Sequence, residues 1–524
     1  MGPMRKGIIK KVTKPEGGIM SAAVSPEKTR TAAEWMKGVI KPEEYEKYLV
    51  NGRDFIDDEN ILSRIEANKN PDPKRIREIF AKSLAINTLD LDETAMLLNM
   101  EDPDLIAEMF ELAGEIKRKV YDNRIVTFAP LYCSNLCVNN CSYCGFRTDN
   151  TDEKRRRLSM DEIVMETRAL AGEIGHKRII AVYGEHHSTD ADYIAESIKT
   201  IYDVEARTRT GRMANIRRVN INAAPMCIED LRKLHEVGIG TYQVFQETYH
   251  HETYSNVHPR GTLKGDYRWR LYCHHRAMEG GVDDVALGAL FGLYDWRFEV
   301  MALVAHARDL ERCFNGLGPH TISFPRLEPA ANTPYSTDSK YLVPDEYFKK
   351  LVAVIRLAVP YTGMILTARE SAQMRREVLP LGVTQTDSST KIGIGAYSER
   401  YSEQEAERQQ FILGDTRSLD EVVREYCDRG YITSFCTAGY RCGRTGDHIM
   451  KLLKCGKEGH MCKLNAVLTF REWLDDFASP ETKAAGEALI KREIEEIKVK
   501  LPKAYASFIE NYSKVVGGAA DIFF

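Results

Sequence analysis

Three cysteines on one short stretch, Cys137, Cys141 and Cys144, stand in the spacing C-x3-C-x2-C. Three thiolates on one loop can hold three corners of a cubane iron–sulfur cluster, which leaves the fourth iron open to a small molecule. Tyr143 directly precedes the last cysteine, where its ring can shield the cluster and lie against an adenine. The spacing therefore predicts a reactive redox centre rather than simple electron storage.

A structural zinc site is the competing interpretation, since closely spaced cysteines also bind zinc. Such a site needs four ligands in two separated pairs. No second pair of cysteines or histidines follows at the spacing found in zinc fingers. Cys133 could in principle replace Cys137, but Tyr143 and the tight last triplet favour the first assignment. The loop has the signature of radical S-adenosylmethionine (SAM) enzymes, which implies a [4Fe-4S] cluster and SAM as cofactors.

The bulk composition is typical of an intracellular enzyme. The chain has 524 residues, a net charge of -4 and 43% hydrophobic residues, with a pI near 6.4. These values predict a large core and no nucleic-acid partner. Twelve cysteines, without a leader or a long apolar run, predict a reducing cytoplasm and no membrane partner. The basic first 14 residues give only weak support for a transit peptide.

The elements that must position the cysteine loop follow from the hydrophobic pattern. Residues 31–118 alternate charged and apolar positions at helical spacing, with a break at Pro71 and Pro73. Short β-rich runs then alternate with amphipathic stretches, which predicts an α/β fold: a (βα)8 TIM-type barrel with its active site at the carboxyl ends of the strands. We expect a helical N-terminal layer over 1–120, the barrel over 121–400 and an α-rich C-terminal domain over 401–524. The expected strands are 124–131, 178–183, 218–223, 241–246, 285–290, 320–325, 364–367 and 383–386.

Candidate cofactor-binding residues lie where these strands end. The cysteine loop follows the first strand, and Gly184 and Glu185 follow the second. Glycine permits close backbone approach, and the carboxylate can receive the ammonium of a bound methionine moiety. Asn222 ends the third strand and Glu247 the fourth. Each is a candidate for the ribose or amino-acid end of SAM, and each could equally be a satisfied polar group at the barrel rim.

Longer strings resemble the hydrogenase maturation tyrosine lyase, the HydG family, from about residue 120 to near the C-terminus. They are Cys-Val-Asn-Asn-Cys at 137–141, Phe-Gln-Glu-Thr-Tyr-His at 245–250, Leu-Phe-Gly-Leu-Tyr-Asp-Trp-Arg at 290–297, Gly-Pro-His-Thr-Ile-Ser at 318–323 and Ala-Val-Pro-Tyr-Thr-Gly-Met-Ile at 358–365. The resemblance implies that a 5'-deoxyadenosyl radical takes hydrogen from the amino group of L-tyrosine. The Cα–Cβ bond then breaks, giving p-cresol and dehydroglycine. The family converts dehydroglycine to carbon monoxide and cyanide on a second cluster.

The second-cluster motif departs from the family pattern, which is C-x2-C followed by a distant cysteine. Here Cys436 is followed by Gly439, and the distant cysteine is Cys462. Because glycine offers no donor atom, a cluster would need Cys442 or Cys455 as a substitute. A substituted or incomplete second iron–sulfur cluster is one interpretation, and inherited buried thiols without a cluster is the other.

His306 matches the position of the family histidine that holds an extra iron at the second cluster, and imidazole suits such a metal. Without the resemblance, a histidine beside apolar helical residues is more often a core or surface residue.

Arginine suits the carboxylate of the substrate, because its planar guanidinium can donate two parallel hydrogen bonds to the two carboxylate oxygens. Arg326 follows the sixth strand, Arg369 follows the seventh, and Ser388 follows the eighth, so all three are candidates for tyrosine binding. In the competing interpretation, the arginines pair with Glu328 or Glu370 at the rim.

The sequence as a whole predicts a radical SAM tyrosine lyase that serves [FeFe]-hydrogenase maturation. Expected partners are tyrosine, SAM, reduced flavodoxin or ferredoxin as electron donor, and hydrogenase maturation proteins. One alternative is a lyase similar to 2-iminoacetate synthase, for thiamine or another pathway without carbon monoxide, which Gly439 favours. Another is a non-catalytic iron–sulfur carrier, which would need neither Glu185 nor Tyr143.

Overall fold

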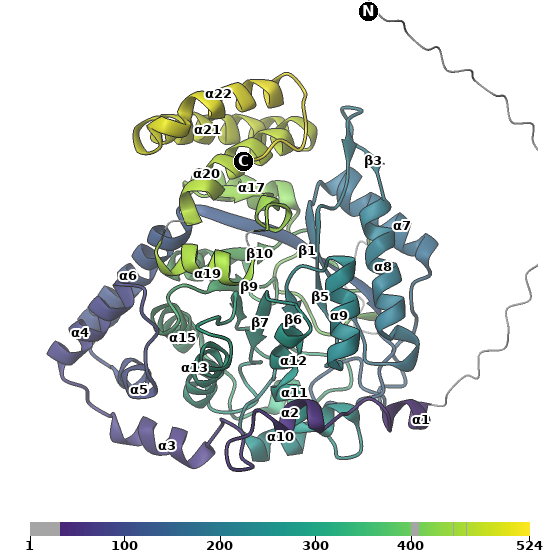
Figure 1. Cartoon of the computed structure of the whole chain (residues 1–524), viewed down its shortest axis with the longest axis vertical. Helices are drawn as coiled ribbons and strands as arrows, with labels where there is room; N and C mark the ends of the chain where they lie inside the picture. Colours follow the sequence, from purple (N-terminus) through teal and green to yellow (C-terminus); the bar gives the residue numbers. More distant parts are fainter. Residues whose placement is uncertain (1–31, 400–407, 444, 457) are drawn as a thin grey trace, which may run out of the picture.

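Eight parallel strands form a closed barrel (Figure 1). The computed structural model describes residues 32–399, 408–443, 445–456 and 458–524. The strands follow one another in chain order, and β10 pairs with β1 to close the circle. The predicted barrel is confirmed, with a strand at each of the eight expected places. They are β1 (Arg124–Ser134), β2 (Arg178–Tyr183), β5 (Arg218–Asn222), β6 (Tyr242–Gln243), β7 (Val285–Gly288), β8 (Thr321–Ser323), β9 (Gly363–Leu366) and β10 (Gln385–Asp387).

Helices cover the outside of the barrel, because each crossover between parallel strands returns over the outer face. Every residue of β1 is therefore buried. A short antiparallel pair, β3 (Ala206–Arg207) and β4 (Met213–Ala214), precedes β5. The helices between the barrel strands are α7 (Met160–Arg168), η1 (Ala169–Ile174), η2 (His187–Thr189), α8 (Ala191–Asp203), α9 (Ile228–Val237), α10 (His251–Val257), η3 (Leu263–Gly265), α11 (Tyr267–Leu271), α12 (Cys273–Glu279), α13 (Trp296–Cys313), α14 (Tyr335–Asp338), α15 (Asp345–Ala358), α16 (Ala372–Val378) and η4 (Leu379–Leu381).

From residue 32 on, the leading segment is helical, as predicted, and packs on the barrel helices α13 and α15. The first 31 residues, which include the stretch considered as a transit peptide, lie outside the described residues. The break at the two prolines is confirmed, because one helix ends at Ala67 and the next begins at Pro73. His251 of α10 holds this layer: its Nδ1 lies 2.9 Å from Asp58 Oδ1 and its Nε2 lies 3.4 Å from Asp54 Oδ1. The helices are α1 (Ala32–Met36), α2 (Glu43–Glu46), α3 (Asp58–Ala67), α4 (Pro73–Leu84), α5 (Leu91–Asn99) and α6 (Pro103–Tyr121).

The C-terminal part adds a strand that the sequence did not predict, β11 (Ile432–Ser434). It pairs in parallel with the first residues of β1, outside the closed circle. The helices around it build a second hydrophobic core that includes Trp473 and Phe508, and α21 and α22 form a layer at the top of Figure 1. The elements are α17 (Leu419–Asp428), α18 (Ala438–Arg441), α19 (Gly446–Lys454), α20 (Glu458–Asp476), α21 (Pro480–Lys500) and α22 (Pro502–Val516).

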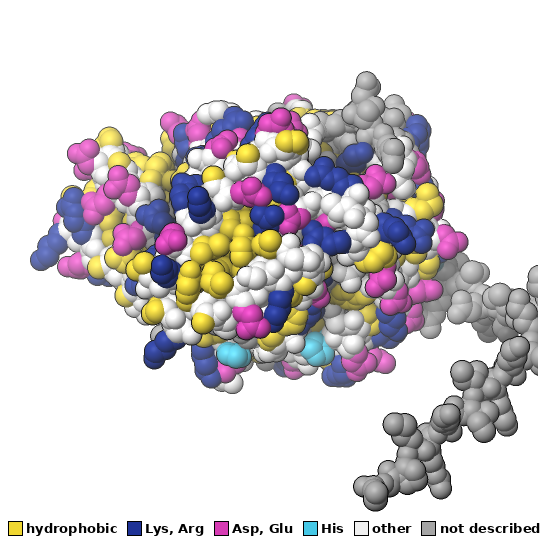
Figure 2. All heavy atoms as spheres, turned by 90° about the horizontal axis from the view of Figure 1, so that it is seen from above, with side chains coloured by type: hydrophobic (Ala, Val, Ile, Leu, Met, Phe, Trp, Pro, Cys, Tyr) yellow, Lys and Arg dark blue, Asp and Glu magenta, His cyan; other side chains and the backbone are white. Residues whose placement is uncertain are grey.

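The surface carries mixed charge. Figure 2 shows basic and acidic side chains interspersed over the face seen from above, around a patch of hydrophobic side chains. Interspersed charges of both signs give this face no extended field of one sign. Within the described residues, no helix combines the length and apolar character that a membrane crossing needs.

Candidate functional site

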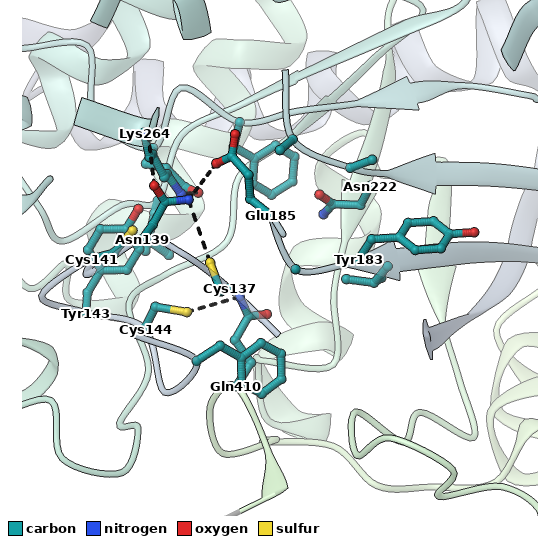
Figure 3. Close-up of a pocket in the computed structure, with 18 of the residues that line it drawn as sticks. Cys137, Asn139, Cys141, Tyr143, Cys144, Tyr183, Glu185, Asn222, Lys264 and Gln410 are labelled. Atoms are coloured by element: carbon teal, nitrogen blue, oxygen red, sulfur yellow. Dashed lines mark hydrogen bonds and ion pairs between the residues drawn. The ribbon is translucent and has the colours of Figure 1, made fainter. Parts of the chain in front are cut away.

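The cysteine loop opens into a pocket at the carboxyl ends of the barrel strands, which we call the upper pocket (Figure 3). It encloses about 1010 Å³ of empty space, open solvent included. Its lining comes from β2 and β5 and from the segments that follow β1, β2, β5, β6, β7, β9 and β10. The lining residues are Cys137, Asn139, Cys141, Tyr143, Cys144, Phe146, Val182, Tyr183, Gly184, Glu185, Asn222, Ala223, Ala224, Phe245, Glu247, Lys264, Arg270, Leu290, Arg369, Gln410 and Phe411.

The three predicted thiols meet in this pocket, whereas Cys133 is fully buried within β1 and does not line it. Thiolates around one zinc ion lie about 3.8 Å apart, given Zn–S bonds of about 2.3 Å. Among the described residues, three metal-binding donor atoms within 4.8 Å of one another occur at His275, Asp309 and Cys313, not at the loop. The loop therefore fits a multi-iron cluster better than a single ion.

Amide groups support the thiols. Asn139 Nδ2 lies 3.7 Å from Cys137 Sγ, and Gln410 Nε2 lies 3.5 Å from Cys144 Sγ. Hydrogen bonds to cluster sulfurs tune the potential of the cluster. Burial raises the pKa of the Cys141 thiol to about 12, against the opposing effect of Lys264. Cluster binding must therefore displace the proton of this thiol.

Gly184 and Glu185 hold the loop from β2. A Cβ on Gly184 would lie 2.1 Å from the carbonyl oxygen of Leu136, so this position requires glycine. The Glu185 carbonyl accepts a hydrogen bond from Val138 N at 2.8 Å, and its Oε2 accepts one from Asn139 Nδ2 at 2.5 Å. Burial raises the pKa of Glu185, although Asn139 opposes this shift. The carboxylate thus sits beside the loop in a desolvated pocket (Figure 3).

Glu247 also lines the upper pocket, but it already has cationic partners. Its Oε1 lies 2.7 Å from Lys264 Nζ and 3.5 Å from Arg270. Burial alone would raise the pKa of Glu247, yet the two cations outweigh this effect and lower it. Its backbone has a φ of 73°, a left-handed conformation that is uncommon for a residue with a side chain. Asn222 lies in the pocket at the end of β5, as expected.

Arg369 reaches the upper pocket, with its guanidinium carbon 3.3 Å from the centre of the Phe411 ring. Within the described part of the chain, no carboxylate pairs with it, and burial lowers its pKa. Stacking on an aromatic face leaves the edge of the guanidinium free to bind a planar carboxylate.

Two predicted substrate ligands do not lie in this pocket. Arg326 pairs with Glu370 and Asp345, so the competing rim interpretation holds for it. Ser388 is 2% exposed and is buried beyond the end of β10, where its Oγ has no hydrogen-bond partner among the described residues.

A second pocket, here called the lower pocket, lies at the amino ends of the strands, where Arg124 begins β1 and Arg178 begins β2. Cys436 and Cys462 both line it, and so does Gly439. Its complete lining is Tyr121, Arg124, Val126, Arg178, Asp284, His320, Thr384, Gln385, Cys436, Thr437, Gly439, Tyr440, Thr445, Ile449, Leu453 and Cys462.

Two other predicted metal ligands lie elsewhere. His306 is a buried residue of α13, where its Nδ1 lies 2.9 Å from the Tyr249 hydroxyl and Phe55 packs on its ring. Cys442 is exposed, like Cys455, and neither lines the lower pocket. The histidine of this pocket is His320, just before β8. Its position at the amino end of a strand was the signal that could have revealed it.

Sequence reasoning also missed residues of the upper pocket. Lys264 and Arg270 lie far from the strand ends that guided the prediction, and Gln410 and Phe411 follow the expected barrel. Asn139 lies within the cysteine loop itself and could have been found there as an amide donor to sulfur.

The fold and the three-thiol loop define a radical SAM enzyme. The Radical SAM superfamily profile matches residues 131–303, and the profile of the Biotin and Thiamin Synthesis associated domain matches residues 323–432. A solved structure of HydG, a maturase of the [FeFe]-hydrogenase, is 45% identical and covers 90% of this chain and 100% of its own, with a TM-score of 0.84. HydG from Carboxydothermus hydrogenoformans is 36% identical and covers 86% and 97%, with a TM-score of 0.71.

A more distant relative is the 2-iminoacetate synthase of Escherichia coli (strain K12), which is 27% identical over 67% of this chain and 87% of its own. The chain belongs to the HydG family. It is a radical SAM carbon–carbon lyase of the tyrosine lyase type, with a [4Fe-4S] cluster and SAM as cofactors.

Proposed function

We propose that the upper pocket cleaves the Cα–Cβ bond of L-tyrosine to p-cresol and dehydroglycine. The observation that carries this proposal is the meeting of three thiols, the carboxylate of Glu185 and the guanidinium of Arg369 in one cavity. The cavity has groups for two amino acids. A carboxylate suits the ammonium of SAM, and a guanidinium that forms no ion pair with the described residues suits the carboxylate of tyrosine.

Cys137, Cys141 and Cys144 are the residues that would hold the cluster, with Tyr143 as a shield and Gly184, Glu185, Asn222 and Glu247 around SAM. When bound, the reduced cluster and SAM supply a 5'-deoxyadenosyl radical that takes hydrogen from the amino group of tyrosine. The protein holds that amine near the radical and excludes water.

Several residues of the upper pocket have roles in this scheme. Glu185 receives the methionine ammonium, and the Asn139 amide fixes its carboxylate. Arg369 fixes the tyrosine carboxylate, because Phe411 holds its guanidinium plane. Phe245 and Leu290 offer apolar surface to the phenol ring. Lys264 stays charged beside Glu247 and lies 5.5 Å from the centre of the Tyr143 ring.

Conversion of dehydroglycine to carbon monoxide and cyanide, for [FeFe]-hydrogenase maturation, is the second half of the proposal. It is supported by similarity to two solved maturases of that hydrogenase. The lower pocket, with Cys436, Cys462 and His320, is the place for this reaction. Reduced flavodoxin or ferredoxin would supply electrons, and other hydrogenase maturation proteins would receive the product.

A second candidate function is tyrosine cleavage without carbon monoxide, as in a 2-iminoacetate synthase. Gly439 favours it, because two cysteines are fewer than a cubane cluster normally uses. The similarity to the E. coli synthase supports it as well.

One experiment separates the two functions. The chain is reconstituted anaerobically with iron and sulfide and incubated with dithionite, SAM and tyrosine. The measurement quantifies 5'-deoxyadenosine, p-cresol, cyanide and carbon monoxide together. Cresol with both diatomic products supports the maturase, and cresol without carbon monoxide supports the synthase-like lyase. Deoxyadenosine without cresol would refute tyrosine as the substrate.

A further inference from the structure

A group of metal-binding side chains lies outside both pockets, on two barrel helices that contact each other (Figure 1). His275 belongs to α12, and Asp309 and Cys313 belong to α13. Asp309 and Cys313 are four positions apart on one helix, so their side chains share a face. The donor atoms of all three residues lie within 4.8 Å of one another. Three residue types that commonly bind metal ions therefore meet at one point between α12 and α13.

One carboxylate oxygen of Asp309 lies near both partners. Its Oδ2 is 2.9 Å from His275 Nε2 and 3.8 Å from Cys313 Sγ. Zinc binds nitrogen and oxygen at about 2.0 Å and sulfur at about 2.3 Å, so tetrahedral ligands lie about 3.3 Å apart for nitrogen and oxygen and about 3.5 Å apart for sulfur and oxygen. The two observed separations are within about 0.4 Å of these values. Small side-chain movements are therefore enough to give one ion a bond to each donor atom.

Arg312 orients the Asp309 carboxylate through its other oxygen. The Nε and Nη2 atoms of Arg312 lie 3.0 and 2.5 Å from Asp309 Oδ1. The Arg312 side chain is 55% exposed, so solvent and salt screen its charge. A carboxylate that binds a metal ion is commonly held by such a hydrogen bond to its second oxygen. Asp309 Oδ2 thus remains available to an ion.

The surroundings set the protonation states that a metal ion needs. Burial lowers the pKa of His275, although Asp309 opposes this shift, so the imidazole is neutral at pH 7. Burial alone would raise the pKa of Asp309, yet His275 and Arg312 outweigh this effect and lower it. His275 is fully buried, with its ring centre 4.7 Å from that of Tyr48. Cys313 is half-buried at the end of α13, which gives an ion a path from solvent.

We propose that His275 Nε2, Asp309 Oδ2 and Cys313 Sγ bind a Zn²⁺ ion that joins α12 to the end of α13. A set of one nitrogen, one oxygen and one sulfur suits zinc, whereas magnesium and calcium require oxygen ligands. A solvent molecule completes the four ligands. Binding releases the thiol proton of Cys313 to solvent and moves the imidazole proton from Nε2 to Nδ1, and no electron is transferred. His275 Nδ1 can take this proton, because it has no hydrogen-bond partner among the described residues.

The test uses the full chain after anaerobic reconstitution with iron and sulfide, so that the cysteine loop is occupied before zinc is added. A slight excess of zinc sulfate is added, unbound metal is removed by gel filtration, and zinc per chain is measured by mass spectrometry. The zinc X-ray absorption spectrum then counts the sulfur ligands, and anomalous diffraction above and below the zinc edge locates the ion in a crystal. We expect about one ion per chain with a single sulfur ligand, bound between α12 and α13.

Three substitutions test the ligands in competition with a zinc chelator. Cys313→Ser removes the thiolate and should weaken zinc binding at least about 100-fold, since loss of a direct ligand costs more than loss of a supporting contact. His275→Gln removes the ligand on the other helix and should weaken binding to a similar extent, so the result does not depend on the folding of one variant. Cys455→Ser is the matched control, because it removes an exposed thiol at the end of α19 and should bind zinc like the wild type.

The number of sulfur ligands separates this site from the other cysteines of the chain. An ion with two or three sulfur ligands would overturn the proposal, because it would lie at the lower pocket or at the cysteine loop instead. A wild-type chain that binds no zinc would overturn it, and so would a folded Cys313→Ser or His275→Gln variant with wild-type affinity. These outcomes do not depend on p-cresol formation, because none of the three residues lines the upper pocket.

Discussion

Replacing Gly184 with alanine should disable the upper pocket through the cysteine loop. The added methyl group would lie 2.1 Å from the carbonyl oxygen of Leu136, whereas real contacts of this kind are at least 3.0 Å. The obstructing atom belongs to the backbone directly before Cys137, so the loop must move by about 1 Å. A misplacement of about 1 Å at reacting groups can lower the rate about 100-fold.

The assay measures iron per chain after anaerobic reconstitution, and 5'-deoxyadenosine formation with SAM and dithionite. We expect Gly184→Ala to bind less iron at the upper loop and to form deoxyadenosine about 100-fold more slowly. Gly517→Ala is the matched control, because its methyl group would meet ordinary contacts of 3.4 Å at an exposed helix end. Far-ultraviolet circular dichroism must show that both variants are folded.

A folded Gly184→Ala enzyme with wild-type iron content and rate would refute the reasoning. It would mean that the loop relaxes without displacing the thiols, and that the close approach of β2 to this loop has no role in cluster binding.

Four other predictions concern single side chains. Asn139→Ala should weaken cluster binding about 10- to 100-fold, measured by iron retention against a chelator, because it removes a support of both Glu185 and a cluster sulfur. Arg369→Lys should raise KM for tyrosine about 10- to 100-fold, since it loses charged hydrogen bonds. Arg326→Gln should leave KM unchanged but lower the free energy of unfolding by about 3 kcal/mol, because it strands the buried Glu370; a KM change there would contradict our placement of the substrate. Burial would lower the pKa of His251, but its two aspartates raise it to about 9. Its stabilising charge is therefore fully present below about pH 6.5 and is lost as the pH rises through about 9, so Tm should fall over this range less in His251→Gln than in the wild type.

The sequence by itself determined the barrel and the first cluster site. The alternation of strands and helices shows in the hydrophobic pattern of short sequence segments. Cys137, Cys141 and Cys144 are close in sequence and lie on one loop. Because a (βα)8 barrel gathers the carboxyl ends of its strands, the same pattern predicted that Glu185 and Asn222 would face that loop, and both line the upper pocket.

Only the tertiary structure decided which distant side chains share a cavity. Arg326 and Arg369 occupy equivalent places after neighbouring strands, yet Glu370 neutralises the first and Phe411 directs the second into the pocket. His306 and His320 lie 14 positions apart, yet the first is a buried residue of α13 and the second lines the lower pocket with Cys436. When the ligand residues of a site share one loop, their spacing in the sequence is enough to identify them. When the residues of a site come from different strands and helices, the closure of the barrel and the competing ion pairs decide which of them reach the cavity.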